Sequence, residues 1–232
     1  DRYGAGLAAE WNGNIAGFPS RLSAGYNAFW TRYPNYKSLA SLFGNELASV
    51  GPGSRTLDTI SHDLTFESAF GISPRWDTWL GYTASFRTFT DQYLANSAGG
   101  YDSTLRNDFD HQMNLGTGFR PNWQLAGFRP SVSLDYRLEL CQSNQNHLDT
   151  NQNQFLPGYY DFLDHAVTIS GEVASKGNSK AKLSYSFSSR TYQERLAQDT
   201  NGLYLGETLP QATHLVSISL SRPIYRGLSL RA

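Results

Sequence analysis

Four of the five histidines in the chain occupy the same position in similar segments, and histidine is the commonest metal ligand among side chains. The segments are SHDLTF with His62, DHQMNL with His111, DHAVTI with His165 and THLVSI with His214. A shared metal site would need three or four of these rings to converge on one point. The elements that carry the histidines decide whether they can converge.

The fifth histidine, His147, lies in the polar segment QSNQNHLDT, two residues before Asp149. A His–Asp pair can act in a hydrolase as a general base and its orienting carboxylate. Oxygen-bearing side chains of this segment could also bind calcium weakly, although the EF-hand spacing is missing. The chain contains no phosphate-binding GxxxxGK[ST] motif. A lone loop histidine near an aspartate is usually solvated and not catalytic, so we expect no enzyme, no metal and no cofactor.

Alternation of apolar and polar residues dominates the chain and predicts β-strands. The clearest case is FRPSVSLDYRLELC, residues 128–141, in which Leu134 and Tyr136 alternate with Asp135 and Arg137. Similar runs begin near residues 60, 76, 109, 163, 183 and 216, and two less regular runs lie at about 3–15 and 21–33.

The connections between these runs alternate in length. Short turns such as GFPS and SPR separate long polar loops at roughly 34–58, 92–107, 142–161 and 194–211. Short turns at one end and long loops at the other are typical of outer-membrane barrels. We therefore expect an all-β fold, an antiparallel up-and-down transmembrane β-barrel with about ten visible strands. We expect residues 1–232 to form a single β-barrel domain, part of a larger barrel and incomplete at one or both ends.

The repeated histidines fit this barrel without a metal. Each one begins a strand that follows a long loop, on the apolar face, and they recur about every fifty residues. Outward side chains diverge around a cylinder, whereas amphipathic rings are favoured at a membrane–water interface. We expect an interface girdle formed by His62, His111, His165, His214 and Trp76.

The alternation alone leaves open which face points inward, because a soluble barrel buries its apolar face. Here the polar face carries charges of both signs among small polar residues, and the apolar face has aromatic residues toward the strand ends, which favours a lipid-facing apolar band. The expected lumen-lining residues are Glu67, Asp77, Arg87, Arg129, Asp135, Arg137, Glu139, Glu172, Lys182 and Arg190. The segment 38–50 has helical spacing at Leu42, Phe43 and Leu47, so it either constricts the lumen or packs on the rim.

Composition excludes several other classes. The 19 Lys and Arg against 20 Asp and Glu give a net charge of −1, without the basic stripe that nucleic-acid binding requires. The single Cys141 excludes an intrachain disulfide and a cysteine-based zinc site. No run approaches the ~20 apolar residues of a membrane-spanning helix, and DRYGAGLAAEW does not have the pattern of a secretory leader.

The turn segment FGISPRWDTWLGYTASFR (70–87) and the histidine-led strands resemble a family of outer-membrane β-barrel porins often encoded near bacterial exopolysaccharide genes. The resemblance covers roughly residues 59–232. It implies the fold and a location in the outer membrane of Gram-negative bacteria, and it implies no catalytic residues.

These observations lead us to expect a porin-like channel that passes polar solutes or an exported polysaccharide through a mixed-charge lumen. The alternative is a sealed structural barrel that anchors or scaffolds a surface complex, and a rim hydrolase is the third reading. The expected partners are the lipid bilayer and lipopolysaccharide, with a polysaccharide or a periplasmic secretion component as further candidates and no nucleic acid.

Overall fold

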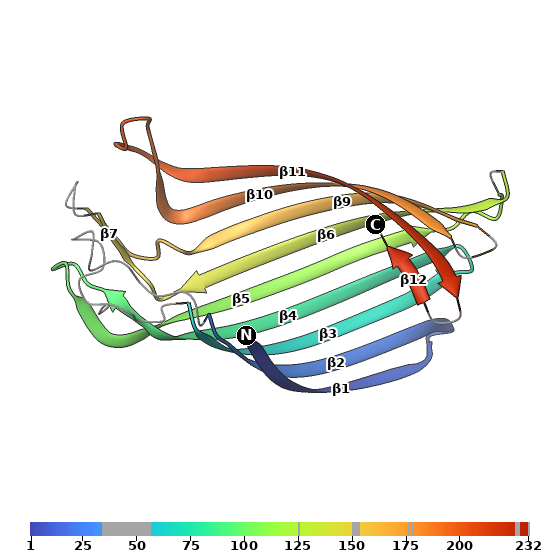
Figure 1. Ribbon diagram of the computed structural model, residues 1–232, viewed down its shortest axis with the longest axis horizontal. Helices are drawn as coiled ribbons and strands as arrows, with labels where there is room; N and C mark the ends of the chain where they lie inside the picture. Colours follow the sequence, from blue (N-terminus) through green and yellow to red (C-terminus); the bar gives the residue numbers. More distant parts are fainter. Residues whose placement is uncertain are drawn as a thin grey trace.

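The computed structural model describes residues 1–33, 57–124, 126–149, 154–175, 177, 179–225 and 228–231, with the backbone alone from residue 223 onward. Ten strands form one antiparallel sheet in which each strand pairs with the next one in its chain order (Figure 1). They are β1 (Arg2–Ile15), β2 (Phe18–Thr31), β3 (Thr59–Ser73), β4 (Trp76–Ala95), β5 (Tyr101–Phe119), β6 (Phe128–Ser143), β9 (Phe162–Ser175), β10 (Lys180–Gln198), β11 (Tyr204–Tyr225) and β12 (Leu228–Arg231).

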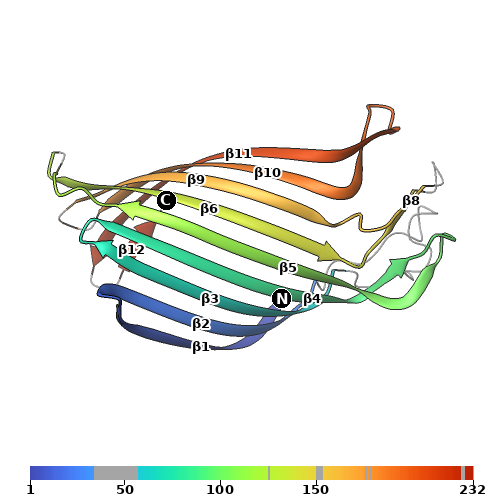
Figure 2. The ribbon, with the colours of Figure 1, turned by 180° about the vertical axis from the view of Figure 1, so that it is seen from behind.

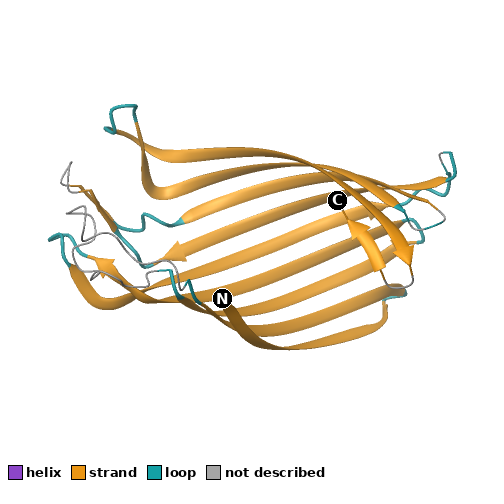
Figure 3. Ribbon diagram, viewed as in Figure 1, coloured by secondary structure: helices purple, strands orange, loops and turns teal. Residues whose placement is uncertain are grey.

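A small separate hairpin of β7 (His147–Asp149) and β8 (Gln154–Leu156) interrupts the connection from β6 to β9. Strands, turns and loops make up all of the described part of the chain (Figure 3). Within these residues, no helix has the length and apolar character needed to cross a membrane.

The connections define two ends of the sheet. At the turn end, β1–β2, β3–β4, β5–β6, β9–β10 and β11–β12 are joined; at the loop end, β2–β3, β4–β5, β6–β9 and β10–β11 are joined. The β1–β2 turn is tight because Ile15 pairs with Phe18 and the two residues between them have positive φ, 51° at Ala16 and 86° at Gly17. Positive φ at both central positions matches the right-handed twist of the flanking strands.

The all-β antiparallel up-and-down fold predicted from alternation is confirmed. The sheet is twisted and curved, and the free edges of β1 and β12 have no strand partner among the described residues (Figures 1 and 2). Closure into a barrel and the extent of the whole domain therefore stay predictions.

Two predicted loops are wrong in extent. The sequence predicts a loop over residues 92–107, but β4 continues to Ala95 and β5 begins at Tyr101. Likewise, β10 and β11 leave only residues 199–203 between them. The ladders run through register shifts in both hairpins, and these shifts break the period-2 pattern that marks a strand in the sequence.

The distribution of buried residues is the reverse of that in a soluble protein. Among the described residues, no large side chain is fully buried, and the buried positions are mostly polar, including Asp108, Asp164 and Ser170. On the apolar face, Leu134 is 46% exposed and Ile169 is 52% exposed. The sheet therefore has a polar face whose side chains are partly buried by one another and an apolar face whose side chains are exposed.

Candidate functional site

The predicted lumen-lining residues all lie on the polar face. Residues that pair across neighbouring strands project from the same face, and the register links Asp77, Glu67, Asp135 and Glu172 to other polar-face positions on adjacent strands. Several of the predicted residues form ion pairs there: Arg87 with Asp110 at 3.8 Å, Arg137 with Glu139 at 3.8 Å, and Glu172 with Lys180 at 3.2 Å. Asp77 contacts Arg120.

Asp164 is the centre of the largest of these charge networks. Its carboxylate is 3.1 Å from the Arg190 guanidinium on β10 and 3.6 Å from the Arg137 guanidinium on β6. The Asp164 side chain is almost completely covered, whereas both arginines keep contact with solvent. Arg190 also stacks over the Phe162 ring, with its guanidinium carbon 3.8 Å from the ring centroid. This network holds three adjacent strands together on the polar face, and Asp164 was absent from the predicted set.

Trp79 forms a second contact across the polar face. Trp79 on β4, Gly116 on β5 and Asp135 on β6 lie in one row of the sheet, because Gly116 pairs with both of the others. The indole crosses β5 above Gly116, where a Cβ would collide with it, and Nε1 donates a hydrogen bond of 3.0 Å to Asp135 Oδ1. The indole is therefore held over β5 by its close approach to Gly116 and by the hydrogen bond to Asp135.

Grooves open on both sides of this indole. One groove of about 320 Å³ is bounded by Trp79 together with Arg21, Glu67, Asn114 and Asp135. A second groove, of about 210 Å³, lies toward the turn end and has Glu172 and Lys182 in its wall. A planar apolar ring flanked by carboxylates, amides and cations can bind a neutral polar molecule such as a sugar, by stacking and hydrogen bonding together.

At the loop end of the polar face, two acidic residues, Asp108 and Asp161, both accept hydrogen bonds from the buried Ser143. The Arg106 guanidinium binds Asp108 at 2.8 Å and lies between the rings of Phe89 and Tyr160. In the β8–β9 connection, Asp161 accepts a hydrogen bond of 2.6 Å from the Ser143 backbone N–H. Burial raises the pKa of Asp161, nearby Asp108 adds to this effect, and the Ser143 hydrogen bond opposes it.

The apolar face carries a repeated feature that sequence reasoning missed. Each histidine of the predicted girdle is hydrogen-bonded through Nδ1 to a tyrosine hydroxyl on the strand before it. The pairs are Tyr26–His62 at 2.7 Å, Tyr82–His111 at 2.6 Å, Tyr136–His165 at 2.6 Å and Tyr185–His214 at 2.8 Å. A separation of 29 residues in three of the four pairs was the available signal.

Trp76 lies at the other end of the apolar face. It starts β4 at the turn end and packs on Phe119 of β5, with ring centroids 4.7 Å apart. The five residues predicted as a girdle are therefore divided between two margins of the apolar band, with the four histidines toward the loop end.

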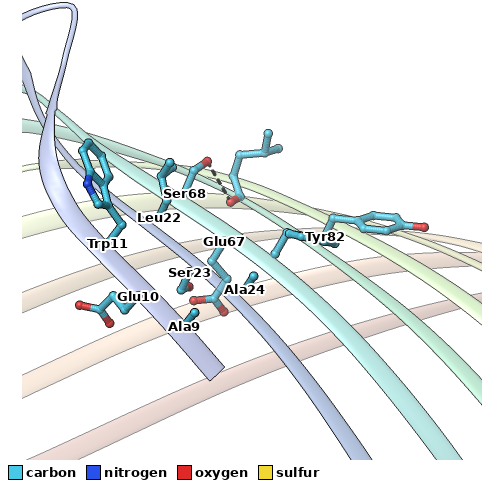
Figure 4. Close-up of a pocket in the computed structure, with 11 residues that line it drawn as sticks. Ala9, Glu10, Trp11, Leu22, Ser23, Ala24, Glu67, Ser68 and Tyr82 are labelled. Atoms are coloured by element: carbon cyan, nitrogen blue, oxygen red, sulfur yellow. Dashed lines mark hydrogen bonds between the residues drawn. The ribbon is translucent and has the colours of Figure 1, made fainter. Parts of the chain in front are cut away.

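The apolar face also has a shallow groove of about 450 Å³ over β1 to β4 (Figure 4). Small side chains such as Ala9 and Ala24 form its floor, and Trp11 and Tyr82 stand at its sides. Ser68 does not leave a polar group open there, because its hydroxyl donates to the Leu80 carbonyl.

The remaining predicted residues take no part in these sites. Leu42, Phe43 and Leu47, the predicted constriction, lie outside the described residues. His147 is in β7 and stacks on Tyr159, with ring centroids 4.4 Å apart, and Asp149 accepts a hydrogen bond from Tyr204. In the described part of the chain, no three His, Cys, Asp or Glu side chains are grouped so that they could hold a metal ion.

No family model matches the chain, and no curated protein is detectably similar to it. Among solved structures, the copper transporter OprC aligns with 95% of this chain, at 12% sequence identity and a TM-score of 0.48. This chain spans 33% of the length of the OprC chain. The resemblance to porins encoded near exopolysaccharide genes therefore stays a prediction.

Proposed function

We propose that this chain forms the wall of an outer-membrane β-barrel channel whose polar face lines the lumen. The observation that carries the proposal is the inverted distribution of side chains: large apolar residues are exposed on one face, whereas the few buried positions are mostly polar and include Asp108 and Asp164 on the other face. Leaving apolar area in water costs about 25 cal/mol per Å², and a surrounding bilayer removes this cost. A soluble barrel would have packed the row of Leu134 and Ile169 inside.

A membrane location also requires that every backbone polar group finds a partner. Hydrocarbon offers no hydrogen bonds, so a sheet that spans a bilayer must have no free edge. In this proposal, the free edges of β1 and β12 are paired in the complete barrel, which has more strands than the ten described in the sheet.

The lumen of this barrel suits uncharged polar solutes or an exported polysaccharide. Charges of opposite sign neutralise one another along the polar face, as between Arg190 and Asp164 or between Lys180 and Glu172. Strong selection for one ion charge is therefore not expected. Trp79 presents an aromatic surface between two polar grooves, and a sugar ring can stack on such a surface.

A sealed structural barrel that anchors a surface complex is the second candidate. It is favoured by the contacts that cross the polar face, since the Trp79–Asp135 hydrogen bond and the pairing of Asp164 with two arginines fill space in which solutes would move. We do not propose a hydrolase, because His147 stacks on Tyr159 and Asp149 is engaged by Tyr204. In both barrel readings, phospholipid and lipopolysaccharide contact the apolar face.

Conductance across planar lipid bilayers separates the two candidates. An open channel gives discrete, stable current steps that neutral oligosaccharides reduce, whereas a sealed barrel inserts without steady current. Flotation with liposomes is measured in parallel. A protein that stays in the aqueous phase, with an apolar face that does not enter lipid, would overturn both candidates.

A further inference from the structure

The four Tyr–His pairs repeat one geometry at each hairpin of the loop end. The tyrosine is on the strand before the connection, and it pairs across the sheet with the residue two positions after the histidine. Tyr26 is thus opposite Leu64, Tyr82 opposite Met113, Tyr136 opposite Val167 and Tyr185 opposite Val216. Each histidine is therefore the diagonal neighbour of its tyrosine on the same face. Diagonal neighbours in a sheet are close enough for two long side chains to touch.

The hydrogen bond to Nδ1 determines what the other ring nitrogen can do. A neutral imidazole has one nitrogen that accepts and one that carries hydrogen. A phenol hydroxyl is a stronger donor than a neutral imidazole N–H, so we assign the tautomer in which Nδ1 accepts from tyrosine and Nε2 carries the hydrogen. A protonated ring also has hydrogen on Nε2. Among the described residues, no hydrogen bond is made to any of the four Nε2 atoms, so in this tautomer each is a donor that a ligand can use.

The pairs lie near the loop-end margin of the apolar face. On the side toward the turn end, each histidine is followed by an apolar residue such as Met113 or Val167. On the other side, Phe86 and Phe109 come next, and then the face becomes polar at Thr88 and Asn107, which hydrogen-bond to each other at 2.8 Å. Two residues of a strand advance about 6.6 Å. Phe109 thus separates His111 from the polar margin at Asn107. In the membrane location proposed above, this position is near the depth of lipid ester and phosphate oxygens.

We propose that the four Tyr–His pairs form a lipid-binding belt in which each Nε2–H donates to a phosphate or acyl-ester oxygen of a lipid in the surrounding leaflet. The tyrosine hydroxyl fixes the ring so that Nε2 faces the lipid. Three of the four histidines are exposed, and His111 is half-buried against Phe109. The proposal rests on the membrane location proposed above, because lipid reaches these donors only if the sheet spans a bilayer.

Solid-state NMR of the full chain with ¹⁵N-labelled histidine tests the belt. In phosphatidylglycerol vesicles, ³¹P nuclei of the lipid should attenuate the Nε2 signals of the belt histidines and leave that of His147 unchanged. Single variants such as His165→Gln assign the signals. In dodecyl maltoside micelles with added inorganic phosphate, no attenuation is expected, since the donors recognise lipid at this depth and not free phosphate.

Variants of the tyrosines test the orienting hydrogen bond. Tyr136→Phe and Tyr185→Phe should each lose most of the ³¹P attenuation at the paired histidine, His165 or His214. The matched control is Tyr93→Phe, which removes an exposed hydroxyl on β4 that no belt histidine contacts, and it should leave all four signals unchanged. Native mass spectrometry should also show fewer retained phospholipids for the first two variants.

The outcomes are separable. The protein could float with the vesicles while the belt signals show no attenuation by ³¹P. That result would refute the lipid-binding belt and leave the Tyr–His pairs only the role of linking neighbouring strands. The membrane proposal would stand. Unchanged attenuation in both tyrosine variants would refute the orienting role. A protein that does not enter the vesicles refutes the membrane proposal and the belt together.

Discussion

Trp79 and Asp135 are joined by a hydrogen bond across an intervening strand. The indole nitrogen of Trp79 on β4 donates to Asp135 on β6 at 3.0 Å, and Gly116 of β5 lies beneath the ring. The contact depends on the glycine, because any side chain at that position would occupy the space of the indole. The absence of a side chain at Gly116 thus allows the Trp79 indole to lie over β5 on the polar face.

Gly116→Ala should displace the indole of Trp79. The added methyl group collides with the ring, so the Asp135 hydrogen bond is lost and the protein is destabilised by about 1–3 kcal/mol, the usual range for overpacking. The measurements are urea unfolding in micelles and tryptophan emission, which should shift to longer wavelength as the ring becomes hydrated.

Gly171→Ala on β9 is the matched control for this change. A Cβ at position 171 meets no atom within 4 Å, so the alanine should be neutral or slightly stabilising through the unfolded chain. Equal destabilisation by both alanines would show that the indole is not held over β5 as described.

Asp164→Asn should leave Arg137 and Arg190 without their shared carboxylate. The expected loss of stability is about 1–3 kcal/mol, less than the ~3–5 kcal/mol for a wholly buried pair, because both arginines remain partly hydrated. In an open channel, the loss of one negative charge beside these arginines, of which Arg137 keeps its contact with Glu139, should also shift the reversal potential under a salt gradient toward anion selectivity.

Glu172→Gln provides the comparison for the charge effect. Glu172 pairs with Lys180, whose side chain is about half exposed, and such pairs contribute little to stability. Glu172→Gln should therefore shift selectivity toward anions, as Asp164→Asn does, with almost no loss of stability. If Glu172→Gln lost as much stability as Asp164→Asn, burial of the carboxylate would not explain the stabilising effect of Asp164.

Much of this arrangement follows from alternation. Parity along FRPSVSLDYRLELC predicts Leu134 and Asp135 on opposite faces, and the structure has them there. The alternation along a strand does not predict the register between neighbouring strands. Trp79, Gly116 and Asp135 become one row only because of the registers of β4–β5 and β5–β6. Those registers depend on bulges and on a long turn, neither of which the period-2 pattern encodes.

The Tyr–His pairs show the same limit. Parity predicts both Tyr136 and His165 on the apolar face, but their contact is diagonal and needs the β6–β9 register. Asp164 is hard to predict for a different reason. In the sequence it adjoins His165 and reads as part of the histidine motif, whereas the neighbours that define its role, Arg137 and Arg190, come from other strands.

Leu134→Arg and Ser133→Arg test which face meets lipid. The two residues are adjacent on β6 and point to opposite faces. An arginine on the lipid face near the bilayer midplane costs ~2–4 kcal/mol, so Leu134→Arg should lower the free energy of unfolding from vesicles by about this amount, whereas Ser133→Arg should change it little. The opposite order would mean that the polar face is the outer one.

Asp161→Asn should stabilise the loop end at neutral pH. Burial raises the pKa of Asp161 above its unfolded value, so the fold disfavours the ionised carboxylate. This penalty is absent below the unfolded pKa of about 3.9, grows as the pH rises toward the folded pKa, and is complete above it. The asparagine keeps an oxygen that can accept the Ser143 N–H hydrogen bond and removes the charge. Its advantage in thermal unfolding should therefore appear as the pH is raised from 3 to 7.

Asp161→Ala separates the charge from the hydrogen bond. The alanine also removes the charge, but it leaves the Ser143 N–H without its acceptor, and an unsatisfied buried donor costs ~1–3 kcal/mol. This variant should be less stable than Asp161→Asn by a similar amount at every pH. If Asp161→Asn instead lost stability as the pH rose, the ionised carboxylate would be favoured in the fold, and the burial that raises its pKa would not be its dominant environment.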